Sequence, residues 1–450
     1  MKKPTQTITP PAIYDVRALG AGKTILLGIQ HTFAMFGATV LVPLLTGLNV
    51  STTLLVAGLG TLLFHFLTKG KVPAFLGSSF AFLGGFGAVA PMLGPDKNIP
   101  NTEMLPYACG GVAAAGLVYV LMSALIAAFG VKRVMQFFPP VVTGPIIISI
   151  GLILAPTAIA NAATDWPLAL VALAVIVVCN IWGKGMVKIV PILLGVVVSY
   201  LVAALTHKVD LSAIGSASFF AMAPITPAKF SLSSIVTIMP IALATMMEHI
   251  GDIAAISATT GKNYIREPGL HRTLLGDGLA TALAGMLGGP ANTTYGENTG
   301  VLALTKVYDP RVMRIAALFA ILLSFIPKFG ALINTIPSAI IGGTSFILYG
   351  MISAIGVRNM VENQVDLTQS RNLIIAGVIL VSALGFQSVG GITFSLLGAQ
   401  INLSGISIAA IAGIALNAIF PGNEYEFPDD DLKPGEEAAR AVGTGVDFQV

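Results

Sequence analysis

Long uncharged stretches recur along the whole of this chain, and they limit its fold more than any other feature. A transmembrane helix needs about 20 mostly apolar residues, and fourteen stretches of the 450-residue sequence approach that requirement. They lie near residues 24–43, 51–68, 74–91, 107–129, 140–156, 166–183, 188–205, 233–256, 273–288, 292–304, 312–328, 336–355, 372–388 and 405–420. Because lipid offers the backbone no hydrogen-bond partner, such stretches must be helical. The sequence therefore predicts an all-α integral membrane protein with 14 transmembrane segments.

The composition agrees with a membrane protein. Only 10% of the residues are charged, whereas a soluble domain carries about 25%. The net charge of +3 gives no reason to expect nucleic-acid binding. Residues 1–22 lack the apolar run of a cleavable signal peptide, so the first long apolar stretch is predicted to be a membrane span.

The positions of Lys and Arg predict the orientation. With the N-terminus inside, 20 of the 24 basic residues fall in alternate loops or at the two ends. The exceptions are Lys97, Lys208, Lys229 and Lys328. Cytoplasmic loops carry such an excess of Lys and Arg, so we expect an even number of spans in the cytoplasmic (inner) membrane and both termini in the cytoplasm. The acidic residues 421–450 are predicted to be a solvated tail.

The order of the segments indicates an internal repeat. We divide the chain into a cytoplasmic N-terminus (1–23), a first repeat (24–205), a connecting loop (206–232), a second repeat (233–420) and a cytoplasmic tail (421–450). Each repeat holds seven segments, and since seven is odd, the second repeat must enter the membrane from the opposite side. The sequence thus predicts two inverted seven-segment repeats.

The third segment of each repeat is a poor helix. Residues 74–91 and 292–304 are short or interrupted by Gly, Pro, Ser and Asn. Unwound backbone is tolerated at membrane depth only beside protein or water, and it starts a half-helix whose N-terminal N–H groups can bind a ligand. Corresponding broken segments indicate a binding site near the middle of the membrane. The alternative is a Gly-rich packing contact between helices.

Three acidic residues lie inside predicted spans. Glu248 and Asp252 are four residues apart and therefore share one helix face. Glu297 lies in the broken tenth segment. Burial and mutual repulsion favour proton uptake by one of them, and ionisable groups in membrane spans are functional by default. The alternative for Asp252 is solvation at the cytoplasmic helix end, while His249 faces elsewhere and is expected to be supporting.

Gln30 and His31 in the first span correspond in position to Glu248. Gln30 precedes Ser79 by the same 49 residues that separate Glu248 from Glu297. The motifs of enzymes are missing from the sequence: there is no phosphate-binding Gly-rich loop with Lys and no nucleophile elbow. No His/Cys cluster has the spacing of a metal site, so we expect a protein that is not an enzyme and has no cofactor.

Several stretches resemble the nucleobase–ascorbate transporter family, and among its members the bacterial uracil permeases. They are Gln30-His-Thr-Phe-Ala-Met-Phe-Gly-Ala38, Leu76-Gly-Ser-Ser-Phe-Ala-Phe82, Glu248-His-Ile-Gly-Asp252, Glu267-Pro-Gly-Leu-His-Arg272 and Asn292-Thr-Thr-Tyr-Gly-Glu-Asn-Thr-Gly300. The resemblance runs from about residue 20 to 420 and implies a core domain (segments 1–4 and 8–11) and a gate domain (segments 5–7 and 12–14). It also implies short antiparallel strands in segments 3 and 10.

The resemblance further implies a substrate site and a coupling ion. Substrate-binding residues are expected at Ala38, Ser79, Phe80, Glu248, Tyr295, Gly296 and Glu297. Proton coupling is expected at Glu248, Asp252 and Glu297, with supporting roles for Gln30, His31, His249 and Asn298. The implied function is proton-coupled symport of uracil by movement of the core against the gate. The expected partners are uracil, protons and the lipid bilayer, with a homodimer left open.

One departure keeps two alternatives open. Some uracil carriers have His where this chain has Asp252, and purine carriers often have Asp there. Purine carriers usually place Gln where this chain has Glu297, which favours uracil. A xanthine or other purine permease is therefore the first alternative. An anion exchanger or channel on the same architecture is the second, and it would require a basic residue at the site.

Overall fold

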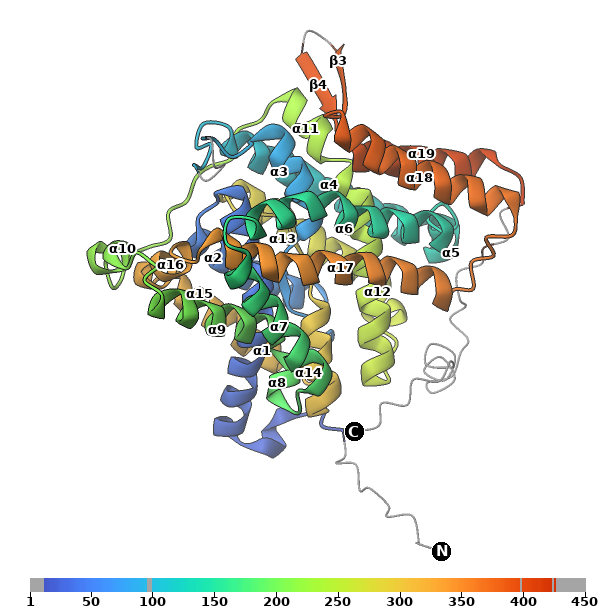
Figure 1. Cartoon of the computed structure of the whole chain (residues 1–450). Coiled ribbons are helices and arrows are strands. Elements are labelled where there is room, and N and C mark those ends of the chain that lie inside the picture. Colours follow the sequence, from blue (N-terminus) through green and yellow to red (C-terminus); the bar gives the residue numbers. More distant parts are fainter. Residues whose placement is uncertain (1–11, 95–98, 397–398, 423–424, 426–450) are drawn as a thin grey trace, which may run out of the picture.

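The computed structural model describes residues 12–94, 99–396, 399–422 and 425. Most of the predicted acidic tail and the first eleven residues lie outside the described residues. The described part is a bundle of helices with two small antiparallel sheets (Figure 1).

The elements of the first half are η1 (Val16–Leu19), α1 (Ala21–Thr46), α2 (Val50–Leu67), β1 (Leu76–Ser78), η2 (Phe80–Phe82), α3 (Leu83–Val89), α4 (Leu105–Phe129), α5 (Val131–Met135), α6 (Pro140–Ala162), α7 (Trp166–Trp182), α8 (Met186–Ile189), α9 (Pro191–Leu205) and α10 (Ser212–Ser216). Those of the second half are α11 (Leu232–Ile238), α12 (Ile241–Thr260), η3 (Ile265–Gly269), α13 (Leu270–Met286), β2 (Asn292–Thr294), α14 (Gly296–Thr305), α15 (Arg311–Ser324), α16 (Pro327–Asn334), α17 (Ser338–Glu362), α18 (Ser370–Ser388), β3 (Ile392–Leu396), β4 (Ala399–Leu403) and α19 (Gly405–Ile419).

Each of the fourteen predicted ranges overlaps at least one of these helices. Within the described ranges, seven helices are long and apolar enough to cross a membrane, or eight if α15 and α16 form one span bent by 84°. The helices α7, α9 and α19 are apolar but shorter. The chain is thus a multi-pass helical membrane protein, and the number of fourteen crossings stays a prediction.

Proline begins several helices at points where the predicted spans are interrupted. Pro191 starts α9, Pro240 caps α12 and Pro327 starts α16. A proline ring has no N–H and clashes with the preceding turn, so the first turn of a helix tolerates it best.

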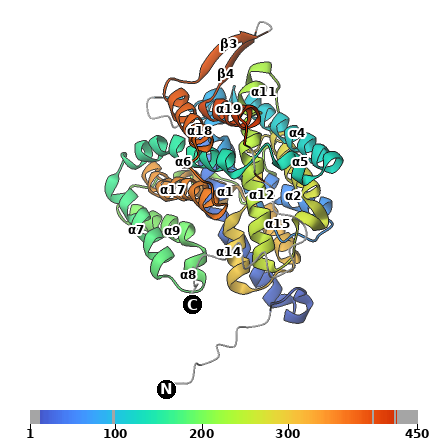
Figure 2. The same ribbon diagram turned by 90° about the vertical axis from the view of Figure 1, so that its right-hand side faces the viewer.

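The helices pack in two groups. In one group α17 packs against α6 and α7, and α18 packs against α6 and α19. In the other group α13 packs against α2 and α4, and α15 packs against α1 and α2. Figure 2 shows α7, α9 and α17 on one side of the molecule and α2, α12 and α15 on the other.

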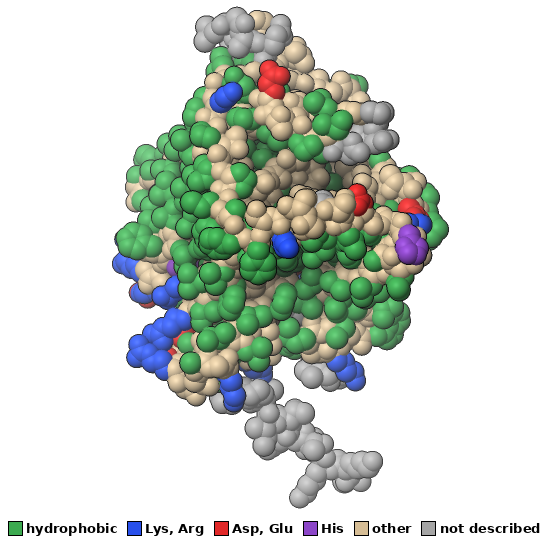
Figure 3. All heavy atoms as spheres, turned by 90° about the vertical axis from the view of Figure 1, so that its left-hand side faces the viewer, with side chains coloured by type: hydrophobic (Ala, Val, Ile, Leu, Met, Phe, Trp, Pro, Cys, Tyr) green, Lys and Arg blue, Asp and Glu red, His purple; other side chains and the backbone are tan. Residues whose placement is uncertain are grey.

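The surface has the distribution expected in a bilayer. Figure 3 shows hydrophobic side chains over the middle of one face, with Lys and Arg gathered toward its lower edge. Large apolar side chains such as Phe66 and Leu205, each 81% exposed, lie on the outside of the bundle. Such exposure is costly in water and favourable in lipid.

Strands β1 and β2 pair antiparallel in the interior, within the third and tenth predicted segments. Leu76 lies opposite Thr294 and Ser78 lies opposite Asn292. The pairing continues at both ends, because Ser79 N donates to Ala291 O at 2.9 Å and Tyr295 N donates to Phe75 O at 3.0 Å. These hydrogen bonds satisfy backbone groups that helices would otherwise have satisfied. A second pair, β3 and β4, extends beyond the helices between α18 and α19 (Figure 1), and the sequence did not predict it.

Gly77 is the central residue of β1, and its lack of a side chain permits the packing there. A β-carbon at this position would lie 2.5 Å from the Tyr295 ring and 2.8 Å from Thr39 Oγ1. Gly84, on α3, has nothing within 4 Å of such a carbon. Only the first glycine is therefore required by close contact.

We expect Gly77→Ala to lower the stability of the detergent-solubilised protein, because overpacking of a filled interior costs about 1–3 kcal/mol. Gly84→Ala is the matched control and should be neutral or slightly stabilising, because alanine favours a helix. The measurement is the apparent Tm of each variant. An equal Tm for both variants would contradict the assignment of Gly77 as a contact-limited position.

Candidate functional site

Helix α12 carries two acids on one face. Glu248 and Asp252 lie one turn apart, and both are partly exposed. His249, on another side of the helix, is fully buried. The sequence spacing predicted that the two acids share one face of the helix and that His249 faces elsewhere, and the structure shows this arrangement.

The start of α14 lies beside these acids. Tyr295 precedes the helix, Gly296 is its first residue and Glu297 lies in its first turn. Thr294 Oγ1 donates a hydrogen bond to Asp252 Oδ2 at 2.7 Å, and a β-carbon at Gly296 would lie 3.8 Å from Asp252 Oδ1.

Glu248 lies one turn before Asp252 on α12, and Asp252 contacts Thr294 and lies beside Gly296, the residue before Glu297. Asp252 repels Glu248. The structure thus brings the three predicted acids together at the end of β2, next to the N-terminus of α14. A carboxylate accepts hydrogen bonds, and a protonated carboxyl also donates one, so this cluster can bind donors, acceptors or protons.

Tyr295 joins the two broken segments. Its hydroxyl donates to Ser78 O at 2.8 Å and accepts from Thr39 Oγ1 at 3.3 Å. Ala38, next to Thr39 on α1, is buried. Ser79 Oγ is buried, and within the described residues it has no hydrogen-bond partner. Such a group is available to a ligand.

Phe80 follows the β1 strand and is half-buried. Its ring meets Tyr349 of α17 edge-on, with 6.2 Å between the centroids. Tyr349 belongs to the other group of helices, so this contact crosses between the two groups. The sequence analysis missed Tyr349, since a tyrosine within an apolar span carries no signal of its own.

The supporting residues of the first span meet α14. Asn298 Nδ2 donates to His31 O at 3.1 Å and lies 3.1 Å from His31 Nδ1. His31 and Asn298 are buried. Gln30 is partly exposed, and its Oε1 atom is buried. These contacts tie α1 to the helix that carries Glu297.

A buried pair of ionisable residues lies behind the acids. His249 Nδ1 is 3.0 Å from Asp277 Oδ2, and both side chains are fully buried. The sequence analysis missed Asp277, although an acid within the span 273–288 was a signal of the same kind as Glu248. This contact fixes α12 against α13.

The stretch at Glu267 lies away from the cluster. Glu267 forms an ion pair with Lys71, which precedes β1. The neighbouring Lys71 lowers the pKa of the Glu267 carboxyl. This pair links the loop before α13 to the loop before β1 and has no contact with the three acids.

The site has an exposed side. Three glycines are exposed there, Gly251 on α12 and Gly296 and Gly300 on α14. The three acids are partly exposed. Both helices continue from there toward Lys262 and Lys306. The exposed side therefore runs toward the end of the molecule that is rich in Lys and Arg.

Solved structures share this fold. The transmembrane domain of a cyanobacterium bicarbonate transporter matches 84% of this chain and 98% of its own length, with a TM-score of 0.59 and 14% identity. The murine Solute Carrier 26 family member A9 anion transporter matches 93% of this chain and 73% of its own length, with a TM-score of 0.62 and 11% identity. At these identities the likeness concerns the fold alone.

Curated relatives match over nearly the whole chain. A uracil permease of Bacillus caldolyticus is 42% identical over 416 residues, which are 89% of this chain and 93% of the relative. A putative pyrimidine permease of Escherichia coli K12 is 39% identical and covers 96% of both chains. The model of a permease family matches residues 22–391. The chain belongs to this permease family, the nucleobase–ascorbate transporter family whose motifs its sequence carries.

Proposed function

We propose that this chain carries uracil across the cytoplasmic membrane together with protons. The observation that supports this most is the cluster of Glu248, Asp252 and Glu297 at the end of the β1–β2 pair. Relatives named as uracil permeases, at about 40% identity, support the substrate class. The protein is a transporter in this proposal, with no catalytic role and no cofactor besides the coupled proton.

The chemistry of the site suits a planar ring with amide groups. Uracil presents ring N–H donors and carbonyl acceptors. A carboxylate of Glu248 or Glu297 would accept from an N–H, and a protonated carboxyl would donate to a carbonyl. Backbone groups at Phe80 and Gly296, where the half-helices begin, would complete the contact. An analogue that lacks one of these groups would leave a buried partner without a hydrogen bond, which gives strong discrimination.

Proton coupling would follow from the crowding of the acids. Three carboxyl groups in a largely buried site cannot all stay ionised at low cost. Uptake of a proton would reduce the charge before the site moves across the membrane. The proton would then leave when the substrate does.

The two packed groups of helices support movement of a core against a gate. Segments 1–4 and 8–11 would form the core, and segments 5–7 and 12–14 the gate. Corresponding segments of the two repeats also contact each other, namely α2 with α13, β1 with β2 and α6 with α17. Elements that lie on a two-fold axis would contact in this way, which supports an inverted repeat.

The distribution of Lys and Arg supports cytoplasmic termini. In this orientation, the exposed side of the site near Gly251 and Gly296 faces the cytoplasm. The state described would then be the one that releases substrate to the cell interior.

We expect Glu297→Gln and Glu248→Gln to weaken uracil binding at least about tenfold, because each removes a hydrogen bond to a charged group. Glu362→Gln is the matched control, because Glu362 is exposed at the end of α17 and pairs with Arg358. The measurements are calorimetric titration with uracil and uptake of labelled uracil into proteoliposomes with an imposed proton gradient. The proposal would be contradicted if the unmodified protein took up uracil equally with and without the proton gradient, or if Glu297→Gln bound uracil as tightly as the unmodified protein.

Asp252→Asn is expected to separate proton coupling from substrate binding. The amide can still accept from Thr294, so the local structure should persist, whereas its proton site is lost. Uptake driven by a proton gradient should fall at least about tenfold, while exchange of labelled for unlabelled uracil continues. A proportional fall in both activities would assign Asp252 to substrate binding instead.

Asp252 also motivates the second candidate, a xanthine or other purine permease. A competition experiment with labelled uracil distinguishes the two. Unlabelled uracil should displace the label at a concentration at least about tenfold below that of xanthine. One missing hydrogen bond at a buried site lowers the affinity by about this factor. The reverse order would identify a purine carrier. The fold alone would allow an anion exchanger, but three acids at the site disfavour an anionic substrate.

A further inference from the structure

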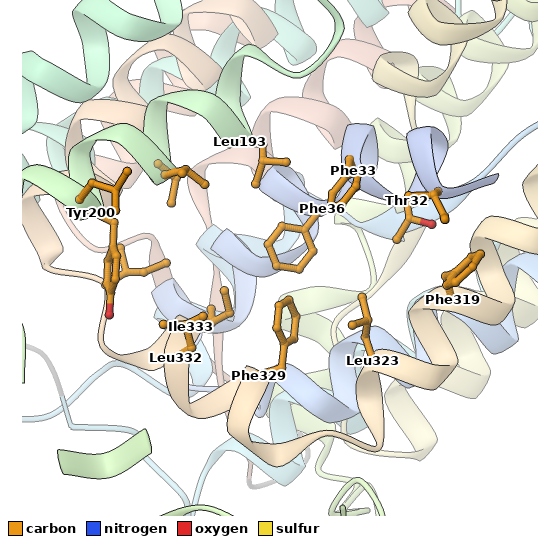
Figure 4. Close-up of a pocket in the computed structure, with 15 residues that line it drawn as sticks. Thr32, Phe33, Phe36, Leu193, Tyr200, Phe319, Leu323, Phe329, Leu332 and Ile333 are labelled. Carbon is orange, nitrogen blue, oxygen red and sulfur yellow. The ribbon is translucent and has the colours of Figure 1, made fainter. Parts of the chain in front are cut away.

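The described surface contains two cavities that lie one above the other on the outer face of α1 and α15. The first, of about 480 Å³, is lined by Arg17, Ala21, Ile25, Arg311 and Ile315 among others. The second, of about 520 Å³, begins at Ile29 and Phe319, one turn further along each helix, and is drawn in Figure 4. The two cavities thus follow one groove, and the site with the three acids is not part of it.

The second cavity is almost wholly apolar. Helices α1, α9, α15 and α16 contribute its walls, with Phe36 and Phe329 facing each other at 5.1 Å between centroids. Figure 4 shows these two rings pointing toward each other, with Leu193 beside them. Phe33 and Val197 line it and are about half exposed at 48% and 45%. An apolar, open-sided groove of this kind excludes polar ligands and suits a hydrocarbon chain.

The first cavity is cationic. The chain segments 12–24 and 305–316 meet there through a bridge between Ile13 and Val307. Of the basic residues on these segments, Arg17 and Arg311 line the cavity, and none of its described lining residues is acidic. Asp15 and Asp309 lie on the same segments.

The acids of this region are already engaged. Asp309 accepts backbone N–H groups of Val16 and Arg311, each at 2.9 Å. Arg311 Nη1 lies 3.1 Å from Asp15 Oδ1, and Arg17 Nε lies 3.9 Å from the same atom. A guanidinium has five N–H donors, so both arginines can also donate to a phosphate.

We propose that this groove binds one anionic phospholipid, with its phosphate at Arg17 and Arg311 and an acyl chain in the apolar cavity. The length agrees, because Ala21 to Phe36 spans about 22 Å of helix and one leaflet with its headgroups is about 20–22 Å thick. Basic residues next to a membrane helix attract anionic lipids. The lipid chain then lies between α9, which packs on α7, and the helices α1, α15 and α16, where it can affect their relative movement.

Native mass spectrometry of the full chain in detergent, titrated with dioleoyl phosphatidylglycerol or dioleoyl phosphatidylcholine, tests the proposal. The anionic lipid should bind at least about fivefold more tightly, and Arg17→Gln should remove about fivefold of its affinity. Arg17 is the preferred position because its side chain is 76% exposed. Arg358→Gln, at an exposed arginine on α17, is the matched control and should change nothing.

Val197→Trp tests the apolar part, because the larger ring fills the groove without touching the arginines. It should weaken binding of both lipids, with an unchanged Tm showing that the chain still folds. Equal affinity for the two lipids, equal effects of Arg17→Gln and Arg358→Gln, or displacement by inorganic phosphate alone would overturn the headgroup assignment. Full lipid binding by Val197→Trp would overturn the assignment of the acyl chain to this groove. A change from dimer to monomer in this variant would also overturn it, because the groove would then be an interface between two copies of the protein.

Discussion

The rest of the site depends on the hydrogen bonding between β1 and β2. Two segments leave the helical conformation inside the bundle, and in an apolar environment each unpaired backbone group would cost several kcal/mol. The segments satisfy each other from Phe75 to Ser79 and from Ala291 to Tyr295. Neither could unwind without the other, so the two segments must meet there. That meeting places the starts of η2 and α14, with their N–H groups, at opposite ends of the paired strands.

Small residues and one tyrosine make this arrangement compact. Gly77 lets the Tyr295 ring approach the strand, and the Tyr295 hydroxyl donates across it to Ser78 O. Similarly, a β-carbon at Gly60 would lie 2.3 Å from Asn292 Nδ2, which donates to Val56 O. Thr39 on α1 and the backbone of α2 at Val56 and Gly60 therefore contact the strand segments. The acids of α12 and α14 are positioned by this framework rather than by contacts with each other, which repel.

Sequence reasoning located the segments that unwind and the acids beside them, because both break strong rules. Clusters of Gly, Pro and Asn in a membrane span, and an acid such as Glu248, are easy to recognise in a sequence whose spans are otherwise apolar. It did not locate Asp277 or Tyr349, since their importance arises from partners on other helices, His249 and Phe80, that spacing alone does not reveal. The bend between α15 and α16 was also missed, although Pro327, which begins α16, lies inside the predicted span 312–328. The β3–β4 pair, between two predicted spans, was missed as well. The division into core and gate rests on the shared family motifs and stays a prediction, because periodicity carries no such information.

The His249–Asp277 pair shows how α12 is held while its acids stay available. Removing two ionisable groups from water is costly, and such a pair is favourable only with good geometry. His249 Nδ1 and Asp277 Oδ2 lie 3.0 Å apart and both side chains are fully buried, so the contact joins the side of α12 that carries His249 to α13. Residues one position apart on a helix point about 100° away from each other, so anchoring His249 leaves Glu248 facing the space beside α14. The side chain that joins α12 to α13 is thus His249, whereas Asp252, on another side of the same helix, accepts a hydrogen bond from Thr294 before α14.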